Sequence, residues 1–178
     1  MTPLVKEGRY AGMISTVRDI TEKMRHEETI KQQARRLADI LEGTRVGTWE
    51  WDIQTGEVTF NERWAEIVGY TLAELAPTNI DTWSRLAHPD DLKFSGGLLD
   101  MHFNGDLPYY ECEARMKHKD GHWVWVLDRG RVSRWTADGK PLFMSGTHQD
   151  ISEMKQTEAL LRDIASRVMS HPQLNSEG

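Results

Sequence analysis

The spacing of apolar residues first follows a helical period. Residues 21–42 contain no Gly or Pro and are dominated by helix formers, and their apolar positions recur at spacings of 4, 3 and 4. These positions are Ile30, Ala34, Leu37 and Leu41. They match the seam of a coiled coil, so the pattern predicts a linker helix over residues 23–43 that pairs two copies of the chain and ends at Gly43 in a left-handed cap. A lone amphipathic helix packed on its own domain is the alternative.

From residue 46 the apolar positions alternate instead. Trp49 and Trp51 share one face of a predicted strand, and Val58 and Phe60 continue the alternation after a turn at residues 54–56. This pattern is typical of a β-hairpin. The last third of the chain repeats it, with alternation at residues 110–116, 123–128 and 142–149 and with turns at residues 119–121 and 137–139.

Helix signals fill the middle of the chain. Asn61 is placed to cap a first helix, Thr71 and Glu74 form a capping box for a second, and a further short segment covers residues 81–86. Pro89 opens a longer helix towards Phe103, which Gly96 and Gly97 should weaken. The order predicts an α+β fold: a five-stranded antiparallel sheet with helices over one face, flanked by N- and C-terminal amphipathic helices.

An internal repeat sets the domain organisation. Residues 8–22 recur in altered form at residues 139–153, and each copy precedes a charged helical stretch. We therefore expect residues 1–22, with a strand at 9–17, to be the end of a preceding domain. A complete domain should then cover residues 44–153, followed by a helix at 154–170 and a disordered tail at 171–178.

The composition of the chain excludes several classes of binding partner and indicates where the protein is located. The net charge of −6 argues against nucleic acid or an anionic membrane as the main partner. No apolar run is long enough to cross a membrane, and no secretory leader is visible. The single cysteine, Cys112, excludes an internal disulfide framework and fits a reducing compartment. These features predict a cytoplasmic protein.

Four short motifs in the sequence resemble those of a known protein family. GTWEWD at residue 47, HPDD at residue 88, the DGHWVWV hairpin at residue 120 and DIS at residue 150 occur in the order and spacing of a PAS sensory domain. The resemblance covers about residues 44–153, and residues 1–22 look like the tail of a preceding PAS domain. It implies a non-catalytic sensor or dimerisation module, linked to an upstream PAS domain and to a downstream output such as a diguanylate cyclase, a phosphodiesterase or a histidine kinase.

The residues agree that the chain is not an enzyme. The phosphate-binding loop, the zinc-protease helix motif, the nucleophile elbow and the CxxC pair are all absent from the sequence. His88, Asp90 and Asp91 suggest a metal, but the first turn of a helix explains both carboxylates better. We therefore expect no metal site.

A cofactor is the open question. The resemblance implies a pocket near Asn61, Trp64 and Trp83, although a helix cap explains Asn61 better. An empty or small-ligand cavity is the main expectation, and FAD or FMN is the leading alternative. Haem would need His102 as its axial ligand, and Cys112 lacks the surroundings of a flavin-reactive thiol.

The final residues of the domain predict a relay. The resemblance places Asp150, Ile151 and Ser152 where the last strand passes into the outgoing helix. We expect Asp150 to cap that helix and to accept a hydrogen bond from Arg129 or Arg131 on the preceding strand. In the core, we expect Trp49 and Trp125 to be the most buried members of their tryptophan pairs.

Overall fold

The structure is a computed structural model that describes the backbone of residues 7–170 and the side chains of residue 20 and residues 22–169. It contains two compact units, residues 1–44 and residues 45–178, which we describe separately. The disordered tail expected at 171–178 lies outside the described residues. None of the helices in the described part is long and apolar enough to cross a membrane.

The first unit consists of one long helix, α1 (Glu7–Thr44). The strand expected at residues 9–17 is therefore wrong for this chain. A β-strand needs hydrogen-bonded neighbours, and this stretch has none here, whereas helix satisfies its backbone groups locally. The helix was also predicted to end at Gly43 in a left-handed cap, and this is wrong. Gly43 is helical, and the residue with a left-handed backbone is Arg45, with φ of 52°.

The second unit is built on a five-stranded antiparallel sheet, as predicted. The strands are β1 (Gly47–Asp52), β2 (Val58–Phe60), β3 (Tyr110–Lys117), β4 (Trp123–Trp135) and β5 (Pro141–Asp150). Their order in the sheet is β2-β1-β5-β4-β3, so the last strand of the chain lies in the middle. In this central position β5 pairs with β1 on one side and with β4 on the other.

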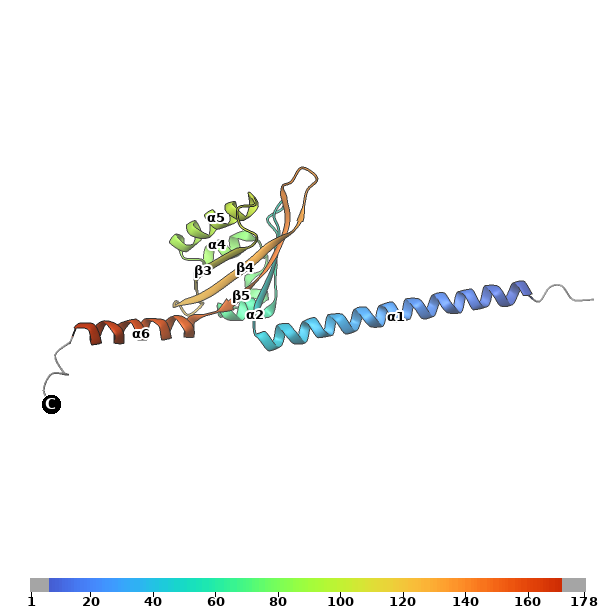
Figure 1. Cartoon of the computed structure of the whole chain (residues 1–178), viewed down its shortest axis with the longest axis horizontal. Coiled ribbons are helices and arrows are strands. Elements are labelled where there is room, and N and C mark those ends of the chain that lie inside the picture. Colours follow the sequence, from blue (N-terminus) through green and yellow to red (C-terminus); the bar gives the residue numbers. More distant parts are fainter. Residues whose placement is uncertain (1–6, 171–178) are drawn as a thin grey trace, which may run out of the picture. The chain divides into compact units, whose positions relative to one another are not determined.

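Four helices connect β2 to β3: α2 (Glu62–Ile67), α3 (Leu72–Leu75), α4 (Ile80–Leu86) and α5 (Pro89–Phe103). Figure 1 shows α4 and α5 on the same side of the sheet. The Asn61 cap and the capping box of Thr71 and Glu74 are confirmed. Gly96 and Gly97 do not break α5.

The outgoing helix α6 (Ser152–Ser170) begins two residues after β5 ends. It starts at Ser152, slightly before the predicted position, and Figure 1 shows that it leaves the sheet directly from the end of β5. The strand and the helix are thus joined with almost no intervening loop.

The burial of the tryptophans agrees with the ranking expected within each pair. Trp49 is buried, with 7% of its surface exposed, and Trp51 is half-buried. Trp125 is half-buried, whereas Trp123 is 41% exposed. The fully buried residues of β4 are nevertheless Val124, Val126 and Asp128, so the inward face of this strand is the one opposite its two tryptophans.

A row of residues in register crosses all five strands beneath the helices. It runs through Phe60, Trp49, Gly146, Gly130 and Tyr110. A Cβ atom at either glycine would lie within 2.5 Å of the Trp49 ring, so only glycine leaves room for the indole. Trp49 thereby lies flat across two neighbouring strands.

Candidate functional site

A cavity of about 50 Å³ lies between the sheet and the helices. Its walls are mostly apolar, formed by Trp49, Trp51, Val58, Phe60, Ile80, Trp83 and Leu99. Four polar residues also line it: Ser95, Tyr110, Asp128 and His148. All four side chains are buried, so their polar atoms need hydrogen-bond partners inside the domain.

Asp128 is the centre of the cluster and receives three donors. Its Oδ1 accepts a hydrogen bond from Trp49 Nε1 at 2.9 Å and lies 3.0 Å from His148 Nε2. Its Oδ2 accepts a hydrogen bond from the Tyr110 hydroxyl at 3.1 Å. A buried carboxylate with three donors is well satisfied, and it fixes the orientation of each donor in return.

The cluster continues from Tyr110 to α5. The Tyr110 hydroxyl lies 2.8 Å from Ser95 Oγ, so the network joins a helix to four strands of the sheet. Burial, and after it the negative charge of Asp128, raises the pKa of Tyr110 far above its usual range. The phenol therefore stays protonated and remains a donor.

Two buried indole N–H groups have no acceptor within the described part of the chain. One belongs to Trp51, which lines the cavity, and the other to Trp64, which does not. His148 uses only Nε2 in its contact with Asp128. The cavity therefore presents donor and acceptor capacity in addition to apolar walls, which suits a small ligand with a polar group or a few water molecules.

The predicted pocket residues have different positions. Trp83 lines the cavity and meets the His148 ring edge-on, with centroids 5.1 Å apart. Trp64 does not line it but is buried behind Phe60, with ring centroids 3.8 Å apart. Asn61 acts as a cap, since its Oδ1 accepts hydrogen bonds from Thr48 N and Trp64 N.

Sequence reasoning missed the polar cluster itself. A signal was available at Asp128, because it shares the inward face of β4 with Val124 and Val126 and so places a carboxylate among apolar residues. Nothing in the sequence pairs that position with His148, because the pairing depends on the register between β4 and β5.

The cavity does not fit a flavin as it stands. Ligand pockets usually measure about 300 Å³ or more, several times the volume found here, so an isoalloxazine ring would have to displace wall side chains. His102 is engaged through both ring nitrogens, with the Leu107 carbonyl and the Val132 N–H, and is not free to bind haem iron. Burial raises the pKa of Cys112 to about 11, which makes its thiol unreactive.

A second arrangement joins the sheet to α6 at the backbone of Trp125. Its N–H donates to Ser152 Oγ at 3.0 Å, and its carbonyl accepts from Ile151 N at 2.9 Å. Ile151 is buried. The backbone of Trp125 therefore binds both Ile151, which follows β5, and Ser152, which begins α6.

The ring of Trp125 is in contact with two cations from different elements. Arg115 of β3 and Lys155 of α6 lie 5.4 Å and 5.3 Å from the centre of its ring. Lys155 also pairs with Glu113 of β3, which raises the pKa of Lys155. The first turn of α6 is therefore fastened to β3 and β4 by charge as well as by backbone hydrogen bonds.

The same chain of contacts reaches α5. Asp91, in the first turn of α5, accepts hydrogen bonds from Arg115 Nε at 2.8 Å, Nη2 at 2.7 Å and the backbone N at 2.8 Å. These bonds, with the Arg115 side chain contributing most, lower the pKa of Asp91. A continuous set of charged contacts thus links the helix above the cavity to the outgoing helix.

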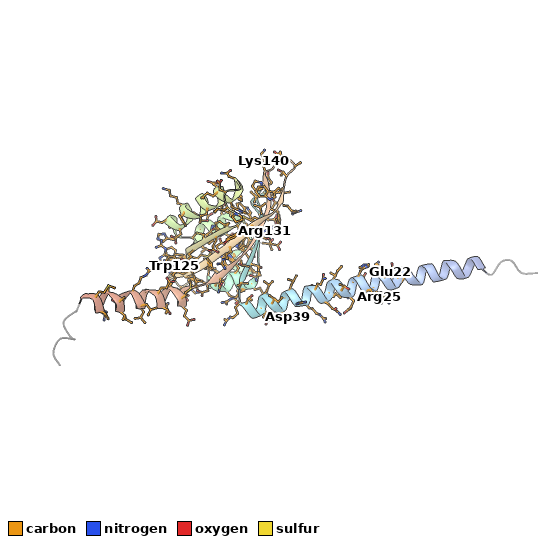
Figure 2. All side chains as sticks on the ribbon, viewed as in Figure 1. Glu22, Arg25, Asp39, Trp125, Arg131 and Lys140 are labelled. Atoms are coloured by element: carbon orange, nitrogen blue, oxygen red, sulfur yellow. The ribbon has the colours of Figure 1, made fainter. Side chains whose placement is uncertain are left out.

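The expected contact between Asp150 and Arg129 or Arg131 is not formed. Asp150 lies opposite Val126, whereas Arg129 and Arg131 lie opposite Thr147 and Ser145, further along the hairpin. Figure 2 shows the same separation, with Trp125 at the α6 end of the sheet and Arg131 further towards the hairpin tip at Lys140.

Asp150 and Arg129 each have a different partner. Arg129 pairs with Glu111, and Asp150 Oδ1 accepts a hydrogen bond from Ser152 N at 2.9 Å. Asp150 thus accepts from the first N–H of α6, as a helix cap does. The arginine contact is absent because the register of β4 and β5 places Asp150 opposite Val126, three residues before Arg129 and five before Arg131.

Comparison with known proteins gives a consistent result. The model of the family described as PAS fold matches residues 57–148. A probable diguanylate cyclase of Escherichia coli, DgcE, is 29% identical over 108 residues, which cover 61% of this chain and 9% of that protein. An uncharacterised protein of Sinorhizobium fredii, y4lL, is 26% identical over 157 residues, 88% of this chain and 18% of that protein. The chain therefore spans less than a fifth of either relative.

Solved structures show the same architecture. A domain of a sensory box histidine kinase/response regulator from Burkholderia thailandensis superposes with a TM-score of 0.67 at 26% identity, covering 76% of this chain and 99% of that one. The N-terminal domain of a diguanylate cyclase with PAS/PAC sensor from Marinobacter aquaeolei has a TM-score of 0.53 at 21% identity, covering 62% of this chain and 98% of that one.

Proposed function

Because the chain belongs to the PAS fold family, we propose that it is a non-catalytic sensor and signal-relay module of a multidomain bacterial signalling protein. The similar proteins include a cyclase and a kinase that carry such domains, which supports a role as a signalling sensor. In this proposal the state of the cavity passes through the sheet to α6, and from there to an output domain that follows in the parent protein.

One observation carries this proposal. Asp128 and His148, which we call the cavity pair, lie three residues from the start of α6 along each of two chain segments. On β4, Asp128 lines the cavity and Trp125 binds the start of α6. On β5, His148 lines the cavity, and Ile151 follows directly after the strand ends. Any movement of these strands that accompanies a change at Asp128 and His148 acts directly on the start of α6.

The helices supply the proposed route to the output. On α6 the apolar residues Leu160, Leu161, Ile164 and Val168 are exposed, and so are Ile30, Leu37 and Leu41 of α1. Exposed apolar seams favour pairing with a second copy. We propose a homodimer through both helices, with Ala34 at the α1 seam, and a relay at Asp150, Ile151 and Ser152 in which Arg129 and Arg131 have no direct part.

The surroundings of the module are part of the same proposal. Residues 1–22 repeat the pattern of residues 139–153, which supports an upstream PAS domain ending there. The free thiol of Cys112 supports a reducing compartment, hence the cytoplasm. The acidic net charge supports protein partners rather than nucleic acid.

The experiment compares the unmodified chain with a variant that loses the contact between the His148 imidazole and Asp128. Hydrogen exchange is measured by mass spectrometry on the 178-residue chain and on His148→Gln, with His26→Gln on α1 as the matched control. The proposal expects faster exchange at residues 150–158 in His148→Gln only. Unchanged exchange there, with the domain still folded, would separate the cavity from the output helix and refute the relay.

The ligand is tested separately. An absorption spectrum of the purified chain, with mass spectrometry of whatever it releases on denaturation, distinguishes a small colourless ligand from FAD or FMN. A flavin spectrum would select the alternative of a redox or light sensor and would require the cavity to open well beyond its present volume.

A further inference from the structure

The turn between β3 and β4 brings together three metal-ligating side chains. His118, Asp120 and His122 each offer one ligand atom, and these atoms all lie within 4.8 Å of one another. His118 Nδ1 is 3.4 Å from Asp120 Oδ2, and the two imidazole rings are stacked with centroids 4.3 Å apart. All three come from five consecutive residues, so little chain has to be ordered to gather them.

The backbone of this turn is already closed. His118 N donates to the His122 carbonyl at 2.9 Å, and Gly121 N donates to the His118 carbonyl at 2.8 Å. Gly121 has φ of 93°, a conformation that glycine adopts without strain. The turn therefore fixes the three Cα positions before any ion binds.

The His118 ring is held from outside the turn as well. It packs against Gly69, where an added Cβ would lie 2.3 Å from Nε2. The adjacent Lys119 donates its N–H to the Val68 carbonyl at 2.9 Å and pairs with Glu74 through its side chain. These contacts anchor the turn to α2 and α3, as a preorganised ligand requires.

We propose that His118, Asp120 and His122 form a binding site for a divalent transition-metal ion such as Zn²⁺, Co²⁺ or Ni²⁺. Two imidazoles and one carboxylate suit these ions and not Mg²⁺ or Ca²⁺, which prefer oxygen ligands. Asp120 and His122 are exposed, so water completes the coordination and the ion enters freely.

Binding needs one local exchange of hydrogen bonds. His118 Nδ1 now accepts from Asp120 N at 3.1 Å, and an ion at Nδ1 would take over that lone pair. The released N–H belongs to an exposed residue, so water can replace the lost acceptor. The His122 side chain is exposed and is free to turn towards the ion.

The test is calorimetric titration of the intact, untagged 178-residue chain with Co²⁺, Ni²⁺ and Zn²⁺ at pH 7.5, with Mg²⁺ as the negative ion. We expect one ion per chain with micromolar affinity, and Ni²⁺ should bind more tightly than Co²⁺. His118→Gln and His122→Gln should each weaken binding by at least about tenfold, and Asp120→Asn by less. Gly69→Ala should also weaken it, because the His118 ring must move.

Matched controls come from the chain itself. His26→Gln removes an exposed histidine of α1, and Asp138→Asn alters the Asp-Gly turn between β4 and β5, which has no histidine. Neither should change the affinity. In NMR spectra, substoichiometric Ni²⁺ should broaden resonances of residues 117–123 and 68–70 first.

Two results would overturn the proposal. One is the absence of binding by all three ions at millimolar concentration. The other is unchanged affinity in a His118→Gln, His122→Gln double variant. His122 is exposed and its variant should fold normally, so the single His122→Gln result stands even where the double variant is unstable.

Discussion

Asp128 and His148 lie directly opposite each other on β4 and β5, with His148 Nε2 3.0 Å from Asp128 Oδ1. Only 5% and 3% of their surfaces are exposed. When one partner of a buried polar contact is lost, the other is left without a partner in the interior, which is costly. The pair is thus suited to register a change in its cavity.

The first prediction concerns Asp128. Asp128→Ala leaves the donors of Trp49, Tyr110 and His148 buried without an acceptor, and it should lower the free energy of unfolding by about 3–5 kcal/mol. Asp128→Asn keeps an acceptor oxygen and should cost about 1–3 kcal/mol. Urea unfolding followed by circular dichroism measures both. Equal, small losses in the two variants would mean that the cluster is hydrated and not internally satisfied.

The second prediction compares two tryptophans. Trp49→Ala empties a buried, hydrogen-bonded site and should cost about 3–5 kcal/mol. Trp123→Ala removes a half-exposed ring that contacts His88 and Lys117, and it should cost about 1 kcal/mol. Denaturation of both variants under one condition gives the comparison. A larger loss for Trp123 would place the core on the opposite face of β4.

The third prediction concerns the fastening of α6. Lys155→Gln removes the ion pair with Glu113 and the cation over Trp125, while the backbone bonds of Trp125 remain. These contacts are partly exposed, so global stability should fall by less than about 1 kcal/mol. Amide exchange at residues 152–158 should rise about two- to fivefold, because local opening becomes easier. Arg162→Gln, further along α6, is the control, and an equal effect there would show that Lys155 has no special role.

The fourth prediction is a pH dependence from Asp91. Arg115 lowers the pKa of Asp91 in the folded chain, so the stabilisation it gives is present above the unfolded pKa of about 3.9 and is lost as the pH falls through the lower folded value. Asp91→Asn should therefore be less stable than wild type by about 1.5–3 kcal/mol at pH 7. The difference should shrink as the pH falls below the unfolded pKa and through the lower folded one.

Urea titrations across this pH range test the prediction. Asp106→Asn is the matched control, because Asp106 is exposed and makes no ion pair within the described residues. A difference between Asp91→Asn and wild type that stays constant with pH would show that the loss is one of packing and not of charge.

The fifth prediction concerns assembly. Light scattering on the intact chain at tens of micromolar should give a dimer, and Ile30→Glu with Leu37→Glu should give a monomer, because charge is placed in the apolar seam. Gln32→Glu with Arg36→Gln changes the net charge equally outside the seam and should leave the dimer intact. A monomeric wild type would exclude the coiled coil.

Local signals explain what the sequence could predict. The caps at Asn61 and Thr71, the proline at the start of α5 and the alternation at Tyr110 to Met116 depend on residues close in the chain, and the structure confirms them. The strand order depends on pairing between residues far apart in the chain, and the sequence did not predict it.

The features that the sequence could not predict share a physical cause. Whether Trp125 or Val126 faces inward depends on the twist and register of the whole sheet, since either side chain suits a core. The pairing of Asp128 with His148, and the failure of Arg131 to reach Asp150, depend on the same register. At residues 9–17 the local pattern indicated a strand, but within residues 7–170 no strand pairs with this stretch, which is helical.

The glycine pair beneath Trp49 has a consequence for the size of the cavity. Gly130 and Gly146 keep a strip of the sheet free of side chains, and the indole alone fills it. A smaller residue at position 49, once its cost in stability is offset elsewhere, would open a trough across two strands beside Asp128 without any change of backbone. The size of the cavity is therefore set by one side chain on β1, while the backbone around it already leaves room for a wider site.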